Sequence, residues 1–431
     1  MPRGLGVLIQ GRTALDTAAD PRSGSRSAES RAAAQVAAPE GFRAEIVPLA
    51  DIATVFAALE RLAHRAGEAN VFFEPTVLEA AMAEVRRTKG LFLVLVWDDA
   101  GGDETDGDER VLAGAMPIEL ARHRWGPWLS ATQVWNHRMG VRGTPLILPG
   151  RGTAFWMHAL DAIAAAGFPR ILLMHTMKAD GEAMRGLEAA TQRSDRHFSV
   201  VNHTPYISLN TDLDGEAYLK ASLSARRYRR SEKARESLGK TGVLERKLYT
   251  TESEVLPAFC QFLELEAAGW KGREGTAILR KPDALRFFLK VIATFARRGD
   301  VQVDTLELDG RPVAMSVAVT SGKTAFCWKT AYEESLSKYT PGYLTVMDVT
   351  RRIVDDPSII GADSCTEAGH SMMESLWSEK SDAADILIDT RPASTGIAIA
   401  IAERLEKGRR RLRGTAKKVY HALRGRLAAL R

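Results

Sequence analysis

Residues 325–344 (AFCWKTAYEESLSKYTPGYL) combine residue types at a spacing that suits an anion-binding site. Thr340 has a hydroxyl suited to a helix N-cap, Pro341 suits the first helical position, and Gly342 lets a ligand approach the backbone. We expect the N–H groups of residues 342–344 to be unpaired, so that they and the positive end of the helix dipole hold a pyrophosphate. Taken alone, Thr-Pro-Gly more often marks an ordinary capped helix, so the surrounding elements must support the site.

The elements around this loop are predicted to form a β-meander followed by one crossover helix. Alternating apolar residues and tight turns predict strands at 301–308, 313–320 and 324–330. Apolar residues at helical spacing then predict a helix over 343–354, and 362–367 is predicted to be a strand parallel to the third. An anion-binding helix start at this position suits an acyl-coenzyme A site, with the thioester arm lying between the two parallel strands.

Several segments, taken together, resemble a known family. They are the stretches 263–277, 328–333, 339–342, 363–365 and 370–377. As a set they resemble the CelD-like acyltransferases of cellulose biosynthesis, which are part of the GNAT superfamily and close to the BioF2-like and FemAB-like groups. The resemblance covers residues 206–388 well and 42–201 loosely.

Three positions depart from the pattern of that family. Glu333 stands where Asp is expected, and Thr340 stands where Ser is commoner. Both of these changes keep the chemistry. Ser371 follows His370 where Pro is expected, which leaves the course of the loop after Glu367 open.

The resemblance implies an α/β (α+β) fold of two tandem GNAT-type domains, each a meander plus βαβ mixed sheet flanked by helices. We expect a disordered segment over 1–41, GNAT-like domains over 42–203 and 204–390, and a basic amphipathic helix over 391–431. The N-terminal half repeats the pattern, with elements predicted at 54–66, 91–97, 111–120, 129–136, 153–166 and 171–175. Its candidate anion loop, residues 150–153, lacks the polar entry of 339–342, so we expect this copy to be structural or acceptor-binding.

Acyl transfer by direct attack on a thioester requires a positioned acceptor, a base and a donor for the developing oxyanion. Backbone amides near residues 329–331 suit the role of donor. For the base we single out Glu367 and His370, where the acceptor must approach. Tyr332 or Tyr339 suits a proton donor to the departing thiolate, a role that tyrosines often take in this superfamily. The two candidate bases equally suit a loop cap or ion pair, and either tyrosine equally suits packing.

The predicted binding residues fall in the same segments. The cofactor, acetyl-CoA or another acyl-CoA, is expected to contact Thr330, Thr340, Pro341, Gly342, Tyr343 and Leu344. Trp270, Lys271, Lys329 and Trp377 are the predicted substrate-binding residues, since flat aromatic faces suit sugar rings and Lys329 suits a carboxylate or phosphate. Core packing is the commoner role of a tryptophan, and a solvated strand position is equally ordinary for the lysine.

Other chemistries have little support in the sequence. The 431 residues contain no G-x-S-x-G elbow, Walker loop or C-x-x-C, and no metal site is predicted. Cys260, Cys327 and Cys365 are expected to be buried thiols rather than a disulfide framework. No apolar run approaches the roughly eighteen residues that a transmembrane helix needs, and we expect a cytoplasmic protein.

The net charge of +5 is unevenly distributed. Residues 391–431 carry twelve Lys and Arg against two Glu, which leaves −5 for the rest of the chain. This tail suits either a peripheral contact with the inner membrane or a membrane-bound synthase, or a solvated helix packed on its own domain. A second block, 220–247, carries ten Lys and Arg against three Glu. We interpret that block as a linker helix at the domain cleft that meets an anionic sugar nucleotide or acyl carrier, and nucleic acid is an unlikely partner.

The sequence therefore predicts an acyl-CoA-dependent N- or O-acyltransferase acting on a sugar or amino-sugar acceptor in cellulose or exopolysaccharide biosynthesis. A GNAT-derived scaffold without catalytic activity, which joins a membrane-bound polysaccharide assembly through the basic tail, is the alternative of a different class. Within the enzymes, a FemAB-like aminoacyl transferase is the alternative.

Overall fold

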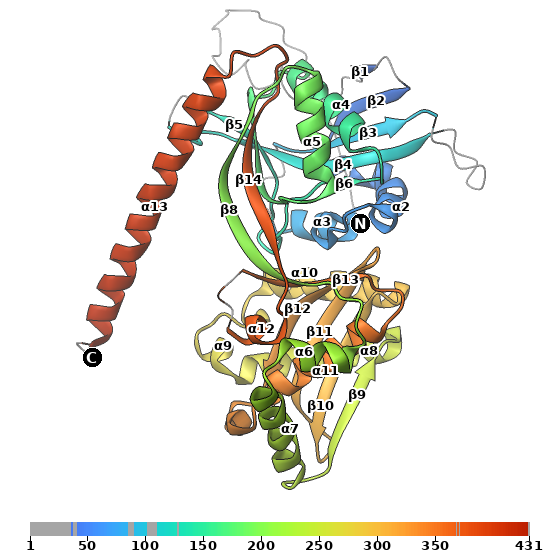
Figure 1. Cartoon of the computed structure of the whole chain (residues 1–431), viewed down its shortest axis with the longest axis vertical. Coiled ribbons are helices and arrows are strands. Elements are labelled where there is room, and N and C mark those ends of the chain that lie inside the picture. Colours follow the sequence, from blue (N-terminus) through green and yellow to red (C-terminus); the bar gives the residue numbers. More distant parts are fainter. Residues whose placement is uncertain are drawn as a thin grey trace, which may run out of the picture.

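The structure is a computed structural model, and it describes residues 36–37, 41–84, 90–100, 110–126, 129–367, 369 and 371–429. Its strands form one continuous sheet that passes through two units stacked along the long axis of the molecule (Figure 1). The strand order is β1-β2-β3-β4-β5-β7-β14-β8-β13-β12-β11-β10-β9, and β6 pairs with β4.

The N-terminal unit begins with an edge hairpin and ends with the long strand β8. Its strands are β1 (Val36–Ala37), β2 (Phe42–Pro48), β3 (Leu91–Asp98), β4 (Val111–Ala121), β5 (Ala131–Val134), β6 (Leu146–Ile147), β7 (Ile171–Lys178) and β8 (Phe198–Leu209). Its helices are η1 (Leu49–Val55), α2 (Phe56–Arg65), η2 (Val71–Phe73), α3 (Pro75–Met82), α4 (Gly152–Ala165) and α5 (Glu182–Arg193).

The C-terminal unit repeats this order after two additional helices. Its strands are β9 (Leu244–Tyr249), β10 (Val301–Leu308), β11 (Arg311–Ser321), β12 (Thr324–Tyr332), β13 (Gly361–Glu367) and β14 (Lys380–Asp389). Its helices are α6 (Gly215–Ser222), α7 (Ala225–Gly239), α8 (Glu252–Ala268), α9 (Trp270–Arg273), η3 (Ile278–Arg280), α10 (Pro282–Arg298), η4 (Glu334–Tyr339), α11 (Pro341–Asp355), α12 (Ser371–Leu376) and α13 (Ile397–Ala429).

The expected pair of GNAT-like copies is confirmed by this topology. In each copy an antiparallel meander leads through a helix to a parallel strand, β5 to β7 in the first copy and β12 to β13 in the second. The predicted strands and helices all lie within a few residues of the observed ones, because their alternating and helical apolar patterns are local properties of the chain. Residues 1–41 lie outside the described part apart from 36, 37 and 41. The disorder expected there is wrong for 36–37, which pair with β2.

Strands β8 and β14 join the two units. The C-terminal strand β14 returns to the N-terminal unit and pairs with β7 on one side and with β8 on the other. At its far end β8 pairs with β13 of the C-terminal unit. Figure 1 shows the two strands running side by side from the upper unit to the lower one. The boundary predicted between 203 and 204 therefore falls inside β8, and β14 belongs to both units.

Helix α13 starts on the sheet and then extends beyond it. Ile399 and Ala402 are buried against Leu173 and Leu387, and the buried carboxylate of Glu406 is held by Arg124 at 2.9 Å. Residues 411–415 are exposed, and Figure 1 shows α13 running down the left of the view to an end that stands apart from both units. Among the described residues, no helix has an apolar stretch long enough to cross a bilayer.

The position of β14 predicts that damage to it destabilises the N-terminal unit as well. Ile388 is fully buried on β14, whereas Ile397 is 62% exposed at the start of α13. We expect Ile388→Ala to lower the free energy of unfolding by about 2–5 kcal/mol, because a large buried side chain is lost. We expect Ile397→Ala to change it by less than about 0.5 kcal/mol. Denaturant unfolding followed by tryptophan fluorescence checks both values, and equal effects of the two changes would contradict the structure.

Candidate acyl-transfer site

The two parallel strands of the C-terminal copy separate after a short paired stretch. β12 and β13 pair at three positions, the last being Phe326 with Asp363. Trp328 is an extra residue in β12, since Lys329 and Cys327 face consecutive residues of β11. Bulges of this kind bend a strand and increase its twist. The remainder of β12 therefore keeps an edge toward β13 that pairs with no described strand.

The helix start beyond β12 differs from the prediction in its hydrogen bonds. Thr340 is at the N-cap position, but its backbone has a left-handed φ of 53° and its side chain makes no cap hydrogen bond. The N–H groups of Tyr343 and Leu344 donate to the Thr340 carbonyl, at 3.0 and 3.1 Å. The expectation of unpaired donors is thus wrong for these two residues, because the left-handed Thr340 directs its carbonyl at the first turn. The Gly342 N–H donates to no described residue.

Tyr332 and Gly342 are brought into contact. Tyr332 ends β12 with 37% of its surface exposed, and a Cβ atom on Gly342 would lie 2.9 Å from Tyr332 Cδ1. A side chain at position 342 would therefore displace the ring. The contact explains why glycine suits this position, and it puts the predicted tyrosine beside the remaining free N–H of the helix start.

A small cavity connects the end of β12 with helix α9. It has a volume of about 30 Å³ and is lined by Leu265, Glu266, Gly269, Trp270, Lys271, Thr330, Ala331, Tyr332 and Glu334. Four predicted site residues thus line the same cavity. Its volume is about that of one water molecule, much less than a pantetheine requires, so binding requires that the wall formed by α9 and η4 move outward.

The Glu334 carboxylate links α9 to η4. Glu334 accepts hydrogen bonds from the Trp270 N–H and, at 2.6 Å, from Arg273. The Arg273 guanidinium and the Trp270 N–H lower the pKa of Glu334. Trp270 itself is 46% exposed, so its ring is accessible to a ligand.

Lys329 is the titratable group that the structure singles out. Its ammonium lies 5.6 Å from the centre of the Phe288 ring, and no ion pair joins it to another described residue. Burial, together with the neighbouring cation Lys271, lowers the pKa of Lys329 below its ordinary value. An amine in this position is more easily deprotonated than a solvated lysine.

Other predicted residues have structural roles. Trp377 is fully buried and donates its indole N–H to Thr350 Oγ1 at 2.9 Å, so the prediction of a substrate-binding face is wrong for this residue. Lys271 is paired with the buried Glu266 at 2.8 Å. Thr330 shares a hydrogen bond of 3.2 Å with Ser316 across the hairpin.

The two predicted bases are not located by the structure. His370 and the side chain of Glu367 lie outside the described part of the chain, although the backbone of Glu367 pairs with Tyr206 of β8. Both remain predictions. Of the three cysteines, Cys260 is exposed, contrary to expectation, because it lies on the outer face of α8. Burial raises the pKa of Cys327 to about 12 and raises that of Cys365 well above its ordinary value, so neither thiol ionises readily. The described residues contain no cluster of ligands for a metal ion.

Arg142 is a residue of the site region that sequence analysis missed. It forms a buried two-pronged ion pair with Asp363, at 2.7 and 2.9 Å, at the position where β13 leaves β12. Its guanidinium also lies 3.7 Å from the centre of the Tyr206 ring. The two partners are 221 positions apart in the chain, and nothing in either segment signals the contact.

In the N-terminal copy, other parts of the chain bond to the edge of β7 and to the loop before α4. β5 and β7 pair for two residues, after which the Gly143 N–H donates to the Thr176 carbonyl of β7 at 3.1 Å. At the start of α4, the Gly150 N–H donates to the carboxylate of Glu182. The chain thus supplies its own carboxylate to the loop that precedes α4.

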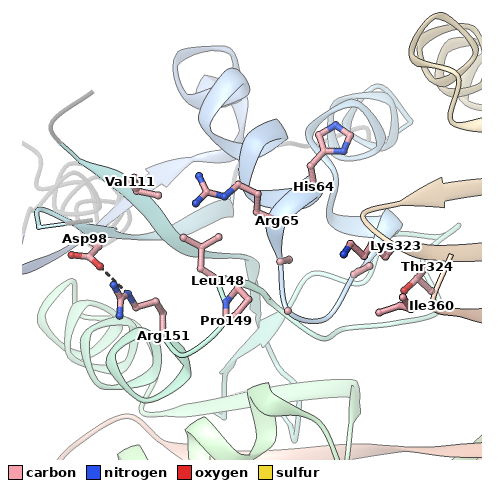
Figure 2. Close-up of a pocket in the computed structure, with 13 residues that line it drawn as sticks. His64, Arg65, Asp98, Val111, Leu148, Pro149, Arg151, Lys323, Thr324 and Ile360 are labelled. Carbon is pink, nitrogen blue, oxygen red and sulfur yellow. Dashed lines mark ion pairs between the residues drawn. The ribbon is translucent and has the colours of Figure 1, made fainter. Parts of the chain in front are cut away.

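A larger groove of about 640 Å³ lies between the units, at the paired ends of β12 and β13 (Figure 2). Arg65 of the N-terminal unit and Lys323 of the C-terminal unit both line it, and Arg151 is paired with Asp98 at 2.8 Å. Because Thr324 begins β12, this groove is at the opposite end of the strand from Gly342. It is therefore separate from the candidate acyl-transfer site.

Residues 224–364 match the family model described as the acetyltransferase (GNAT) domain. The matched segment runs from α7 to β13 and includes the separated strands and the start of α11. The C-terminal copy is thus a GNAT-type acetyltransferase domain, and the protein is an acyltransferase. A search of curated proteins gave no match.

Three solved structures are similar to this chain over most of its length. FemX is 10% identical with a TM-score of 0.49, over 77% of this chain and 95% of that one. The C-terminal domain of a putative lysylphosphatidylglycerol synthetase from Agrobacterium fabrum is 11% identical with a TM-score of 0.44, over 81% and 94%. A tandem GNAT protein from the clavulanic acid biosynthesis pathway is 15% identical with a TM-score of 0.36, over 81% and 100%. Values this low support no inference on substrate, and the fold assignment rests on strand order and the family match.

The contrast between the copies predicts one acyl-CoA per chain. Calorimetric titration with acetyl-CoA or a non-hydrolysable analogue is expected to give a stoichiometry of one, because the Glu182 carboxylate already bonds to the loop before α4 in the N-terminal copy. Glu182→Gln retains an acceptor for the Gly150 N–H and is expected to leave that stoichiometry unchanged. A stoichiometry of two would contradict the assignment of roles to the copies.

Proposed function

We propose that this protein is an acyl-CoA-dependent N- or O-acyltransferase that acts on a sugar or amino-sugar acceptor in cellulose or exopolysaccharide biosynthesis. The observation that carries the proposal is the separation of β12 from β13 beside a helix start whose Gly342 N–H is free. The acceptor class and the pathway come from the resemblance to CelD-like acyltransferases. Acyltransferase activity itself is supported by the family match.

The free edge of β12 suits the arm of an acyl-pantetheine. Unpaired N–H and C=O groups on a strand edge bind an added extended chain through main-chain hydrogen bonds. The amides of a pantetheine offer such groups, and Gly342 with the positive end of α11 offers a place for the pyrophosphate. Tyr343 and Leu344 lie at this helix start but offer no free N–H group to the pyrophosphate, since both of their N–H groups are already bonded.

Lys329 suits the role of general base because burial lowers its pKa. In the proposed step its neutral amine takes a proton from the acceptor nitrogen or oxygen, which bonds to the thioester carbon while the carbon–sulfur bond breaks. Tyr332, next to Gly342, is placed to return a proton to the leaving thiolate. Glu367 and His370 remain alternative bases.

The exposed ring of Trp270 supports a sugar acceptor. It lines the same cavity as Tyr332 and Thr330, so an acceptor stacked on it lies near the end of the free strand edge. Its backbone N–H is already fixed by Glu334, which leaves the aromatic face for the ligand. Membrane or synthase contact through α13 is part of the same proposal and rests on the basic sequence of that helix.

Gly342 provides the direct test of the donor site. We expect Gly342→Asp to abolish the rise in melting temperature that acetyl-CoA produces, because a carboxylate there repels phosphate and displaces Tyr332. The matched control is Gly408→Asp, at an open position on α13. If acetyl-CoA gives no stabilisation of the unmodified protein at any concentration, the scaffold alternative is favoured and the enzymatic proposal fails.

Lys329→Met separates a catalytic role from a structural one. Because the folded state lowers the pKa of Lys329, the cost of burying its charge is fully present below the folded pKa, declines as the pH rises above it, and is gone once the pH exceeds the unfolded pKa. We therefore expect Lys329→Met to raise the melting temperature at pH 7 and to lower kcat by about 10²–10⁴-fold. Lys323→Met, on the exposed turn before β12, is the control and is expected to change neither.

The pH dependence provides the second measurement of this test. For the unmodified enzyme, kcat/KM is expected to rise as the pH increases through the lowered pKa of Lys329, and this limb is expected to disappear in Lys329→Met. A destabilised variant that keeps the full pH profile would show that Lys329 is a packing residue.

A further inference from the structure

Helix α7 carries an exposed row of cations on its outer face. Five exposed cations recur at helical spacing from the first turn of α7 to the residue that caps its C-terminus, with the exposed Glu236 beside them: Arg226, Arg229, Arg230, Lys233 and Lys240. The distance from the first to the last along the axis is about 21 Å, at 1.5 Å per residue. Among the described residues none of these five side chains has an ion-pair partner. We call this row the α7 stripe.

The opposite face of α7 is fully used in packing. Arg235 bonds to Asp348 and to the Leu344 carbonyl of α11, at 2.8 and 3.4 Å. Arg351, two turns further along α11, lies near Glu232 at 3.5 Å. The inward face thus meets its charge partners, and the α7 stripe is not part of the folded core.

These contacts also fix the direction of the helix. Residue 235 contacts Leu344 and Asp348 in the first half of α11, and residue 232 lies near Arg351 further along it, so α7 runs antiparallel to α11. The last turns of α7 therefore lie near the start of α11, and α7 also contacts η4. Figure 1 shows α7 at the lower end of the C-terminal unit, outside the domain cleft where the sequence was interpreted to place it. The stripe thus leads to the predicted pyrophosphate position.

We propose that the α7 stripe is a docking surface for a small acidic carrier protein that holds the acyl group as a thioester on a phosphopantetheine arm. The inference rests on the proposed function, because the same strand edge receives the arm. Free coenzyme A has phosphates at only one end, so its phosphates require a shorter row of cations than the one of about 21 Å on α7. The row matches the length of one acidic helix of a protein partner instead.

The charge of the remaining surface favours a carrier protein over a nucleic acid. Removing the +10 of residues 391–431 and the +7 of residues 220–247 from the net +5 leaves −12 for the rest of the chain. A duplex, about 20 Å wide, extends beyond one helix and meets this acidic remainder. A compact acidic partner that contacts α7 alone avoids most of that repulsion.

The test compares three acyl donors in a thiol-release assay: acetyl-pantetheine, acetyl-CoA and an acetylated acidic carrier protein. The quadruple variant Arg226→Glu, Arg229→Glu, Arg230→Glu, Lys233→Glu is expected to lower kcat/KM for the carrier by about tenfold or more, and more strongly at low salt. Its kcat/KM for acetyl-pantetheine is expected to stay within about twofold, since that donor carries no phosphate. The double variant Arg185→Glu, Arg193→Glu reverses two exposed charges on α5 of the N-terminal unit and is expected to affect no donor.

Each result decides between the two proposals. Two results overturn the carrier inference and leave the proposed function intact. One is turnover of acetyl-pantetheine with no preference for the carrier, and the other is an equal loss with all donors in the quadruple variant. If no donor is turned over, the proposed function fails. In that case, carrier binding measured by fluorescence anisotropy tests the docking surface independently of turnover. Binding of transfer RNA that is lost in the quadruple variant would assign the stripe to nucleic acid and overturn the carrier.

Discussion

The separation of β12 from β13 is the constraint on which the C-terminal unit depends. Main-chain groups on a strand edge require partners, and a sheet interior normally supplies them. Here the extra residue Trp328 bends one strand, while the ion pair of Arg142 with Asp363 holds the start of the other. The edge that results is long enough to accept an extended ligand and lies next to a helix start. The proposed binding and catalytic groups therefore lie at the same place, where β12 separates from β13.

The two copies share the same arrangement of strands and crossover helix but differ in the groups that bond to it. In the N-terminal copy, Gly143 bonds to the edge of β7 and Glu182 bonds to the loop before α4. In the C-terminal copy the corresponding positions are open or lightly covered by Tyr332. Because β8 and β14 cross between the copies, the filled copy acts as a rigid support for the open one. A support of this kind is useful where the site itself carries unpaired groups, which do not stabilise the folded state.

Lys329 illustrates the cost of such a site. A lysine that is largely buried without an ion-pair partner destabilises the folded protein, and the neighbouring pair of Lys271 and Glu266 shows that the chain satisfies charges elsewhere in the same region. Residues retained against stability are candidates for function. The same reasoning applies at the surface to the α7 stripe, whose like charges repel one another along a helix whose other face is fully paired.

The sequence by itself determined the order of the elements, the duplication, and the loop at residues 325–344, because apolar periodicity, turn residues and a Pro-Gly helix start are local properties of the chain. It also determined that the charge of the molecule is concentrated in two segments. Only the tertiary structure decided that Trp377 is a core residue, that Arg142 reaches Asp363, and that the left-handed Thr340 takes two of the expected donors. These outcomes depend on packing between distant segments and on one backbone angle. A local pattern fixes neither, since the same residues are compatible with several arrangements until the sheet has formed.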